Sequence, residues 1–363
     1  MSGMRHLRVP SEETARWRDR LLSEGWLATG VGIQADEDHR LLPLNDSAPE
    51  AGASVYDGHL LTELTSLERG PQHWRDRLDA ALLDKIGHLL PTAHEVQGDV
   101  LLVKLEPEIE PHASVMAQAM LDQFPHVRIV CADGGVTGEY RVRDLRVLLS
   151  RDGNTSTVTV VKEHGLAYTL DPSTAYFSAR LSGERGAAMD LIDAHRALLG
   201  RRLVVHDPYA GVGPNLGLPL HRGAVETAVV GDLNGAAIPF LRSNLEHIIS
   251  RSNHPDAGLV VREGDGRAWA EEHTLLNRAD VLFVNLPHDG LDHVHHLLPL
   301  LADDALLIGW AIVDRDEEGA LAERVQGMFA EAGRGSEISV HFTKGFSTTR
   351  AMVRLVVRST TGS

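Results

Sequence analysis

Cysteine is nearly absent from this sequence of 363 residues, in which Cys131 is the only one. A single cysteine excludes an internal disulfide, and without a Cys-x-x-Cys pair the sequence offers no thiolate zinc site. Cys131 lies in the apolar run 127–132, where we expect it to be a core residue. Redox chemistry and cysteine-bound metal are therefore poorly supported.

Long apolar runs are absent as well. No stretch of eighteen or more apolar residues occurs, and the N-terminus passes into charged residues without a hydrophobic signal region. We therefore expect a cytoplasmic protein that does not associate with membranes. Hydrophobic residues at 43% and charged residues at 24% are typical of soluble globular proteins, and the length allows two or three domains.

Positive charge is scarce. The formal net charge is −16, which argues against broad, nonspecific adhesion to nucleic acid. A local basic face is still compatible with this value. The segment 341–363 has no acidic residue and contains four basic ones, Lys344, Arg350, Arg354 and Arg358. It weakly favours an anionic partner.

The first half of the chain mixes helical and strand-like segments. Residues 7–45 are expected to form a small unit with an amphipathic helix at 12–24, and 46–58, rich in Ala, Gly, Ser, Asp and Pro, a linker or mobile loop. Helices are then expected at 73–90 and 114–124, and strands at 99–105, 127–132, 141–149 and 156–165. This order predicts a mixed α+β domain.

From about Asp190 onward, short apolar runs alternate with helical segments, as in a parallel doubly wound sheet. Its strands are expected at 203–207, 227–232, 258–261, 280–285 and 306–313. The chain then has two strand-like runs, 337–342 and 350–358, without a helix between them, which predicts an antiparallel pair. That ending is typical of methyltransferase sheets rather than of ordinary dinucleotide-binding sheets.

A glycine-rich turn follows the first of these strands and opens a helix. Gly211 and Gly213 stand where the backbone approaches a ligand and a Cβ is not tolerated. Asp232 closes the next strand 21 residues after Gly211, the position at which an acid bonds ribose hydroxyls in nucleotide-binding α/β folds. S-adenosylmethionine has a ribose but no pyrophosphate, so the strict GxGxxG spacing is not required. Turn glycines with a helix-capping Asp are the alternative interpretation.

Further residues at the strand ends complete the predicted cofactor site. Asp265 follows the third strand, on the expected adenine side, although helix capping explains it equally well. The fourth strand ends in Asn285-Leu286-Pro287, where the Asn amide can both accept from and donate to a nitrogen heterocycle and the proline stiffens the turn. The predicted cofactor-binding residues are Asp207, Tyr209, Gly211, Gly213, Asp232, Leu233, Asp265, Gly266 and Asn285.

At these residues the chain resembles the archaeal and eukaryotic tRNA (guanine-37-N1)-methyltransferase family, which also contains the wybutosine-pathway aminocarboxypropyltransferases. The resemblance spans nearly the whole chain, and its most specific parts are the segment 176–185 and the Asn-Leu-Pro strand end. We therefore predict an α/β class I methyltransferase fold with a Rossmann-like, mostly parallel seven-stranded sheet. It occupies 187–363, after a small N-terminal domain and linker at 1–58 and an α+β middle domain at 59–186.

The resemblance also implies roles for individual residues. Glu184 resembles the general base that takes the N1 proton of guanine, and Tyr176 resembles the residue that packs against the target base. Arg141 or Arg143 resembles an arginine that stabilises charge developing on O6, with no choice between the two. Without the family, an ion-pair or core role explains each of them as well.

The remaining predicted catalytic and substrate contacts lie on either side of Glu184 in sequence. Asn285 and Pro287 resemble groups that clasp the guanine edge, and Tyr176, Arg180 and Asn285 are expected to bind the substrate. Arg180 and Arg185 flank Glu184, so a purely structural ion pair with one of them is the alternative. The implied cofactor is S-adenosylmethionine, and the implied partner is tRNA, bound by a monomer.

Two departures from the family keep other acceptors open. Ala179 stands where the family usually has Pro, and Asn215 where it usually has an aromatic residue. The alternatives are transfer of the aminocarboxypropyl group of the same cofactor, and a redirected paralogue that methylates a small molecule or peptide. Asn285 and Glu184 favour methyl transfer over the first alternative. No metal is predicted, because the spacing of His288, His293, His295 and His296 matches no standard site.

Overall fold

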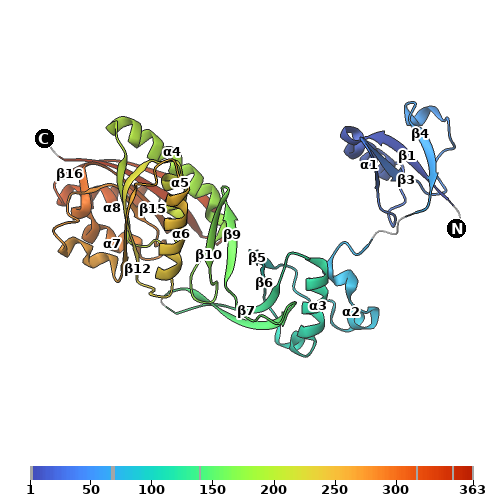
Figure 1. Cartoon of the computed structure of the whole chain (residues 1–363), viewed down its shortest axis with the longest axis horizontal. Helices are drawn as coiled ribbons and strands as arrows, with labels where there is room; N and C mark the ends of the chain where they lie inside the picture. Colours follow the sequence, from blue (N-terminus) through green and yellow to red (C-terminus); the bar gives the residue numbers. More distant parts are fainter. Residues whose placement is uncertain (1–2, 67–69, 139, 316–317, 346, 362–363) are drawn as a thin grey trace. The chain divides into compact units, whose positions relative to one another are not determined.

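The computed structural model describes residues 3–66, 70–138, 140–315, 318–345 and 347–361. The chain forms two compact units, Met1–Gly87 and His88–Ser363, and each has its own hydrophobic core. Figure 1 shows both units coloured along the sequence. None of the described helices is long and apolar enough to cross a membrane.

The first unit contains a four-stranded antiparallel sheet in the order β2-β3-β1-β4. Its strands are β1 (Met4–Pro10), β2 (Gln34–Asp36), β3 (His39–Pro43) and β4 (Leu60–Leu64). Helix α1 (Thr14–Ser23) packs Trp17 and Leu21 against Leu7 of β1. The amphipathic helix expected at 12–24 is thereby confirmed.

The segment 46–58, expected to be a linker or mobile loop, contributes to this core. Ala48 and Tyr56 are 4% and 1% exposed, and the Tyr56 hydroxyl donates a hydrogen bond to the Pro49 carbonyl at 2.7 Å. The segment then leads into β4, which pairs with β1. The polar residues of this segment therefore form turns on either side of two buried residues, Ala48 and Tyr56.

The single helix expected at 73–90 is wrong, because the structure divides this segment. A short 3-10 helix, η3 (Trp74–Arg77), is followed by helix α2 (Ala80–Ile86). Asp79 is the N-cap of α2, and its carboxylate accepts a hydrogen bond from the Ala81 N–H at 2.9 Å. An N-cap residue has non-helical backbone, so one periodic stretch becomes two helices.

The second unit begins with a four-stranded mixed sheet in the order β5-β6-β7-β8, followed by the separate hairpin β9-β10. The strands are β5 (Glu95–Gln97), β6 (Val100–Val103), β7 (Ile129–Thr137), β8 (Val142–Ser150), β9 (Thr159–Glu163) and β10 (Leu166–Leu170). Helix α3 (Ala113–Gln123) connects the parallel strands β6 and β7. The predicted strands correspond to β6, β7, β8 and β9. Cys131 is fully buried, as expected, and burial raises its pKa to about 11.

The larger sheet of this unit has seven strands in the order β13-β12-β11-β14-β15-β17-β16. They are β11 (Leu203–Asp207), β12 (Val225–Asp232), β13 (Gly258–Glu263), β14 (Ala279–Val284), β15 (Leu301–Asp314), β16 (Arg334–Gly345) and β17 (Arg350–Thr361). The first five in spatial order are parallel, and β17 is antiparallel to both β15 and β16. Both the parallel sheet and the antiparallel ending are therefore confirmed. The strand order reverses between β11 and β14, which opens a crevice at their carboxyl ends.

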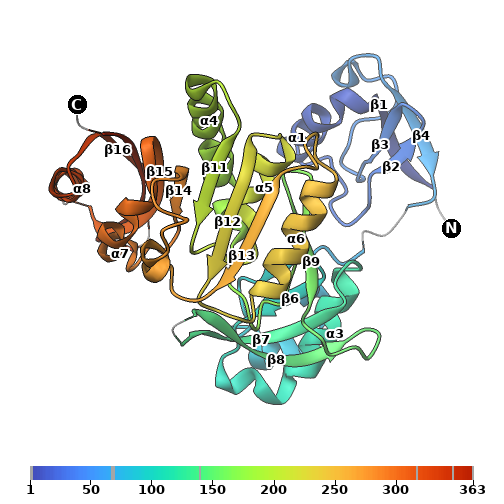
Figure 2. The ribbon, with the colours of Figure 1, turned by 60° about the vertical axis from the view of Figure 1, so that its left-hand side comes forward.

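Helices cover both faces of this sheet (Figure 2). One core cluster joins the sheet to α4 (Ser182–Leu199), α5 (Pro214–His221) and α6 (Ile238–Ser250), and the other joins it to α7 (Gly290–Leu297) and α8 (Glu318–Glu331). Alternate residues of β14 and β15 belong to the two clusters, so Trp310 of β15 faces the α4 side. Helix α4 runs without a break across position 186. The three-part division at 58 and 186 stays a prediction.

Candidate active site

The glycine-rich turn between β11 and α5 needs glycine at two positions. Gly211 has a φ of 54° and Gly213 a φ of 93°, in the left-handed region that other residues rarely adopt. A Cβ on Gly213 would also lie 2.9 Å from the Leu245 Cδ2 of α6. The turn therefore brings bare backbone to the carboxyl end of β11, as the spacing predicts.

Asp232, the last residue of β12, fastens this turn to the neighbouring strand. Its carboxylate accepts hydrogen bonds from the Gly211 N–H at 2.8 Å and the Asn234 N–H at 2.9 Å, one on each oxygen. Burial raises its pKa. An ionised carboxylate offers about four acceptor positions, so both oxygens can still accept from hydroxyl groups. Asp232 therefore fits the ribose of a nucleoside cofactor.

Asp207, the last residue of β11, supports the glycine turn through hydrogen bonds. It is fully buried, and its carboxylate accepts from the Asn215 Nδ2 at 3.1 Å and the Tyr209 N–H at 3.2 Å. Burial raises its pKa to about 7. Asn215, which replaces an aromatic residue of the family, thus acts as a buried donor to Asp207.

The other predicted cofactor residues lie in the loops after β11, β12 and β13. Gly266 allows the third loop to pack closely, since a Cβ there would lie 2.6 Å from the Pro208 Cβ. Asp265 caps the 3-10 helix η6 (Gly266–Glu271) and pairs with Arg267 at 2.6 Å, and the hydrogen bond from Arg267 lowers the pKa of Asp265. Leu233 is exposed beside Asp232. Asp265 therefore caps η6, and its cofactor-binding role stays a prediction.

Tyr209 joins this region to helix α7. Its hydroxyl lies 2.8 Å from the His293 Nδ1, and the two rings are tilted at 44° to each other. Across the described residues, no group of three or more His, Cys, Asp or Glu side chains is placed to hold a metal ion.

The Asn285-Leu286-Pro287 turn at the end of β14 is fixed through its backbone. The Pro287 carbonyl accepts from the Ile312 N–H of β15 at 2.9 Å, and the Leu286 carbonyl from the Gly290 N–H at 2.6 Å. Asn285 is half-buried, and no other described residue hydrogen-bonds its side-chain amide. That amide is available to a ligand.

Glu184 lies in the first turn of α4. Its Oε2 accepts from the Arg354 Nη1 at 2.7 Å and from the Trp310 Nε1 at 3.3 Å. The flanking arginines have other partners, because Arg185 pairs with Glu163 and Arg180 approaches Glu95 at 3.4 Å. The expected alternative, an ion pair of Glu184 with Arg180 or Arg185, is therefore wrong in its partner. Sequence reasoning missed Arg354, although the acid-free segment 341–363 contains it.

The buried pair of Arg185 and Glu163 holds the segment 176–185 on β9. The two side chains are 4% and 5% exposed, and the Arg185 Nε donates to the Glu163 Oε1 at 2.6 Å. Arg185 also donates to the Ser178 carbonyl at 2.9 Å. Tyr176 is thereby kept next to the glycine turn, since a Cβ on Gly211 would lie 3.7 Å from its carbonyl oxygen. The Tyr176 ring itself is 48% exposed.

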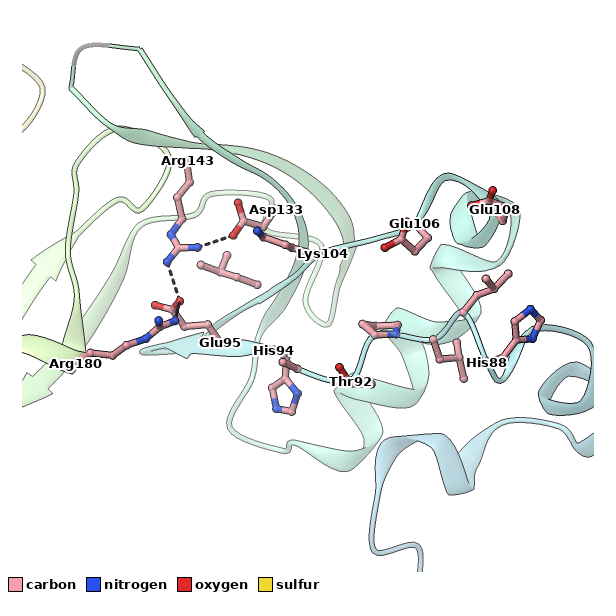
Figure 3. A pocket seen from close by; sticks show the side chains of 15 residues that line it. His88, Thr92, His94, Glu95, Lys104, Glu106, Glu108, Asp133, Arg143 and Arg180 are labelled. Carbon is pink, nitrogen blue, oxygen red and sulfur yellow. Dashed lines mark hydrogen bonds and ion pairs between the residues drawn. The ribbon is translucent and has the colours of Figure 1, made fainter. Parts of the chain in front are cut away.

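The two candidate arginines differ in their surroundings. Arg143 donates to the Asp133 carboxylate at 2.5 Å and the Glu95 carboxylate at 2.7 Å (Figure 3). Arg141 is exposed with a φ of 53°, and its side chain has no hydrogen-bond partner among the described residues. Burial, followed by the Arg141 charge, lowers the pKa of His288, the residue after the Asn-Leu-Pro turn. Arg143 is thus already paired with two carboxylates, whereas the Arg141 side chain is available to a ligand.

A cavity of about 800 Å³ lies beside Arg143 and Arg180 (Figure 3). Its charged lining is mixed and contains Lys104, Arg143 and Arg180 together with Glu95, Glu106, Glu108 and Asp133. None of the predicted cofactor-binding residues lines it. The cavity therefore belongs to the β5–β8 part of the unit and does not mark the cofactor position.

Two protein-family models match this sequence. The TRM5/TYW2 methyltransferase domain matches residues 159–341, and the TYW2 N-terminal domain matches residues 74–154. The chain belongs to the TRM5/TYW2 methyltransferase family. The first match contains Tyr176, Glu184, Asp232 and Asn285.

Curated relatives of the family carry two activities in their names. The chain is 33% identical over 219 residues to tRNA (guanine(37)-N(1))-methyltransferase 2 of Arabidopsis thaliana, a match that covers 58% of this chain and 32% of that relative. It is 34% identical over 146 residues to tRNA(Phe) (4-demethylwyosine(37)-C(7)) aminocarboxypropyltransferase of Pyrococcus horikoshii, covering 40% and 48%. The chain thus spans about a third of the plant relative's length.

Solved structures give the fold. Trm5b from Pyrococcus abyssi matches with a TM-score of 0.68 at 22% identity, over 98% of this chain and 99% of that one. TYW2 from P. horikoshii, solved with MeSAdo, matches with a TM-score of 0.63 at 22% identity, over 80% and 98%. The large sheet therefore has the class I methyltransferase fold predicted from its strand pattern.

Proposed function

We propose that this TRM5/TYW2 family member is an S-adenosylmethionine-dependent methyltransferase that modifies N1 of guanine 37 in tRNA. The observation that carries the proposal is that Glu184 and the Asn-Leu-Pro turn are both bonded to neighbouring residues of β15. Glu184 accepts from Trp310 of β15, and two residues further on the Ile312 N–H holds the Pro287 carbonyl. A carboxylate and a turn with an available amide thus both adjoin β15.

The cofactor is assigned to the loops after β11 and β12. Asp232 has the capacity to accept from ribose hydroxyls, and the bare backbone at Gly211 and Gly213 leaves room for a nucleoside. When bound, S-adenosylmethionine supplies an electrophilic methyl group. Leu233, Asp265 and Gly266 are assigned to the adenosine part of the same site. Asp207 and Tyr209 are assigned to it as well, at the glycine turn.

The acceptor base is assigned to the side chains around Glu184. Asn285 donates to and accepts from the guanine edge, with Pro287 fixing the turn, and the exposed Tyr176 ring packs against the base. Arg141 stabilises negative charge on O6, since Arg143 already neutralises Asp133 and Glu95. Glu184 takes the N1 proton, which leaves an electron pair on N1.

Transfer of the aminocarboxypropyl group is the second candidate. It is favoured by the match of residues 74–154 to the TYW2 N-terminal domain and by the 34% identity to the archaeal relative of that name. Methylation of a small molecule or peptide is a third candidate, which the net charge of −16 supports.

Double labelling separates these candidates. One sample of S-adenosylmethionine carries label on the methyl group and another on the carboxyl carbon, and each is incubated with total tRNA and with a tRNA-free metabolite extract. We expect methyl label in tRNA, located at guanine 37, and no carboxyl label. Carboxyl label in tRNA would replace the proposal with aminocarboxypropyl transfer, and label only in the extract would replace tRNA as the acceptor.

Two further assignments belong to the proposal. We infer that the segment 1–58 binds tRNA separately from the cofactor, because its described strands form part of another sheet and none belongs to the seven-stranded sheet. A monomer in the cytoplasm is the expected state and location of the enzyme.

A further inference from the structure

The two oxygens of the Glu184 carboxylate have different surroundings. Oε2 accepts both of the hydrogen bonds described, from the Arg354 guanidinium and the Trp310 indole. No other described residue hydrogen-bonds Oε1. The carboxylate is therefore held by one oxygen, while the other is left for a ligand.

Strand register brings the two donors together. Trp310 of β15 and Arg354 of β17 are directly paired across the antiparallel strands. Met352 and Val356, two residues to either side of Arg354, pack in the same core cluster as Trp310 and α4. Side chains two apart along a strand share a face, so both donors point towards Glu184.

Neither donor has a competing role within the described part of the chain. The Arg354 side chain is 14% exposed, and its buried Nε has no hydrogen-bond partner among the described residues. Trp310 is 4% exposed and stacks on Phe283 with ring centroids 6.3 Å apart and planes 8° apart. Packing thus fixes the indole, and Glu184 is the described acceptor for both side chains.

We propose that Arg354 and Trp310 are positioning residues that anchor Glu184 by Oε2 and present Oε1 to the acceptor. This inference rests on the proposed function, in which the N1–H bond of guanine breaks, its proton passes to Oε1 and its electron pair stays on N1. A base works only from within hydrogen-bond reach of its proton, so a carboxylate free to rotate loses productive geometry. The two donors act through Glu184 and do not touch the base.

Arg354→Gln tests the guanidinium, with Arg358→Gln as its matched control. Arg358 is an exposed arginine of the same strand, so it undergoes the same charge change away from Glu184. With a guanosine-37 tRNA transcript, we expect Arg354→Gln to lower the single-turnover methylation rate about tenfold or more, with unchanged KM for tRNA and unchanged Kd for S-adenosylmethionine. Arg358→Gln should keep the wild-type rate. Trp310→Phe, which keeps the ring stack and removes the donor, should show a smaller loss.

A double-mutant cycle distinguishes positioning from general structural support. Arg354→Gln should cause no further loss of rate when Glu184 is already Gln, because the group it positions is gone. An equal loss in both backgrounds, or a wild-type rate for Arg354→Gln alone, would overturn the positioning role. Thermal melting of each variant is measured on the same samples. If Arg354→Gln does not fold, Arg354→Lys, which keeps the charge but donates from one nitrogen, runs the same cycle.

The same cycle keeps the two proposals separate. A Glu184→Gln variant that methylates at the wild-type rate, or a wild-type chain that methylates no tRNA, would overturn the proposed function together with this inference. A slow Glu184→Gln variant beside a fast Arg354→Gln variant would overturn the positioning role alone.

Discussion

The two halves of the candidate active site are held in different ways. The proposed cofactor side contains Asp207, Gly211, Gly213, Asp232 and Asp265, and it depends on carboxylates that accept from backbone N–H groups. The proposed acceptor side contains Arg141, Tyr176, Glu184 and Asn285, and side-chain ion pairs between distant segments hold its segment 176–185. Glu163 pairs with Arg185, and Glu184 with Arg354, 170 residues away. The hydrogen bonds of the first group join each carboxylate to a nearby turn or adjoining loop, whereas the ion pairs need residues far apart in the sequence to meet.

The largest effect is expected at the buried ion pair of Arg185 and Glu163, which holds the segment 176–185. Arg185→Gln leaves Glu163 as a buried carboxylate without its guanidinium, which should lower the free energy of unfolding by about 3–5 kcal/mol. Urea unfolding measures it. Arg180→Gln is the control, because Arg180 is 76% exposed and should change stability by less than about 0.5 kcal/mol. Equal stabilities for the two variants would mean that the buried pair does not support this side.

The same contrast explains which parts of the site are predictable. Gly211, Gly213 and Asp232 follow from spacing, because a strand, a turn and the next strand fix their neighbourhood within 21 residues. The meeting of Arg354 with Glu184 depends on the register of β17 against β15, which no local pattern contains. A segment without acids, 341–363, indicated only that positive charge gathers there.

The fold shows the same division. The parallel strands are short apolar runs with helices between them, so their positions and the parallel sheet are recoverable from sequence. The segment 46–58 and the helix at 73–90 are not, because their outcome depends on Tyr56 finding a buried site and on Asp79 capping a new helix. In each segment the structure depends on a single side chain, Tyr56 in the first and Asp79 in the second.

On the cofactor side, Asp232→Ala should weaken S-adenosylmethionine binding by about 2–4 kcal/mol. The ribose loses its charged acceptor, and the Gly211 and Asn234 N–H groups lose theirs. Isothermal calorimetry gives the dissociation constant. Asp256→Ala is a suitable control, because its exposed carboxylate pairs with Arg202 instead. A wild-type dissociation constant for Asp232→Ala would remove this residue from the cofactor site.

Arg141 and Arg143 sharpen the comparison within the acceptor side. Arg141→Ala should reduce the single-turnover rate by about a hundredfold, the effect of removing one donor to a developing oxyanion, while the protein melts normally. Arg143→Ala should instead lower the melting temperature, because Asp133, which is 9% exposed, loses its cation. Thermal melting and the rate are measured on both variants. The reverse pattern would exchange the two assignments.

The last effect concerns Asp207 and depends on pH. Burial raises the pKa of this carboxyl to about 7 in the folded chain, above its unfolded value of about 3.9. The folded state therefore binds the proton more tightly, so stability is highest below about pH 4 with respect to this group and falls as the pH rises towards 7. The slope cannot exceed about 1.4 kcal/mol per pH unit for one proton. Asp207→Asn keeps one of the two acceptor oxygens that Tyr209 and Asn215 use and does not titrate, so its stability relative to the wild type should rise between pH 4 and pH 7. Urea unfolding at several pH values measures the difference. Parallel pH profiles for the two proteins would show that Asp207 is ionised throughout, as an accessible ligand of the cofactor would be.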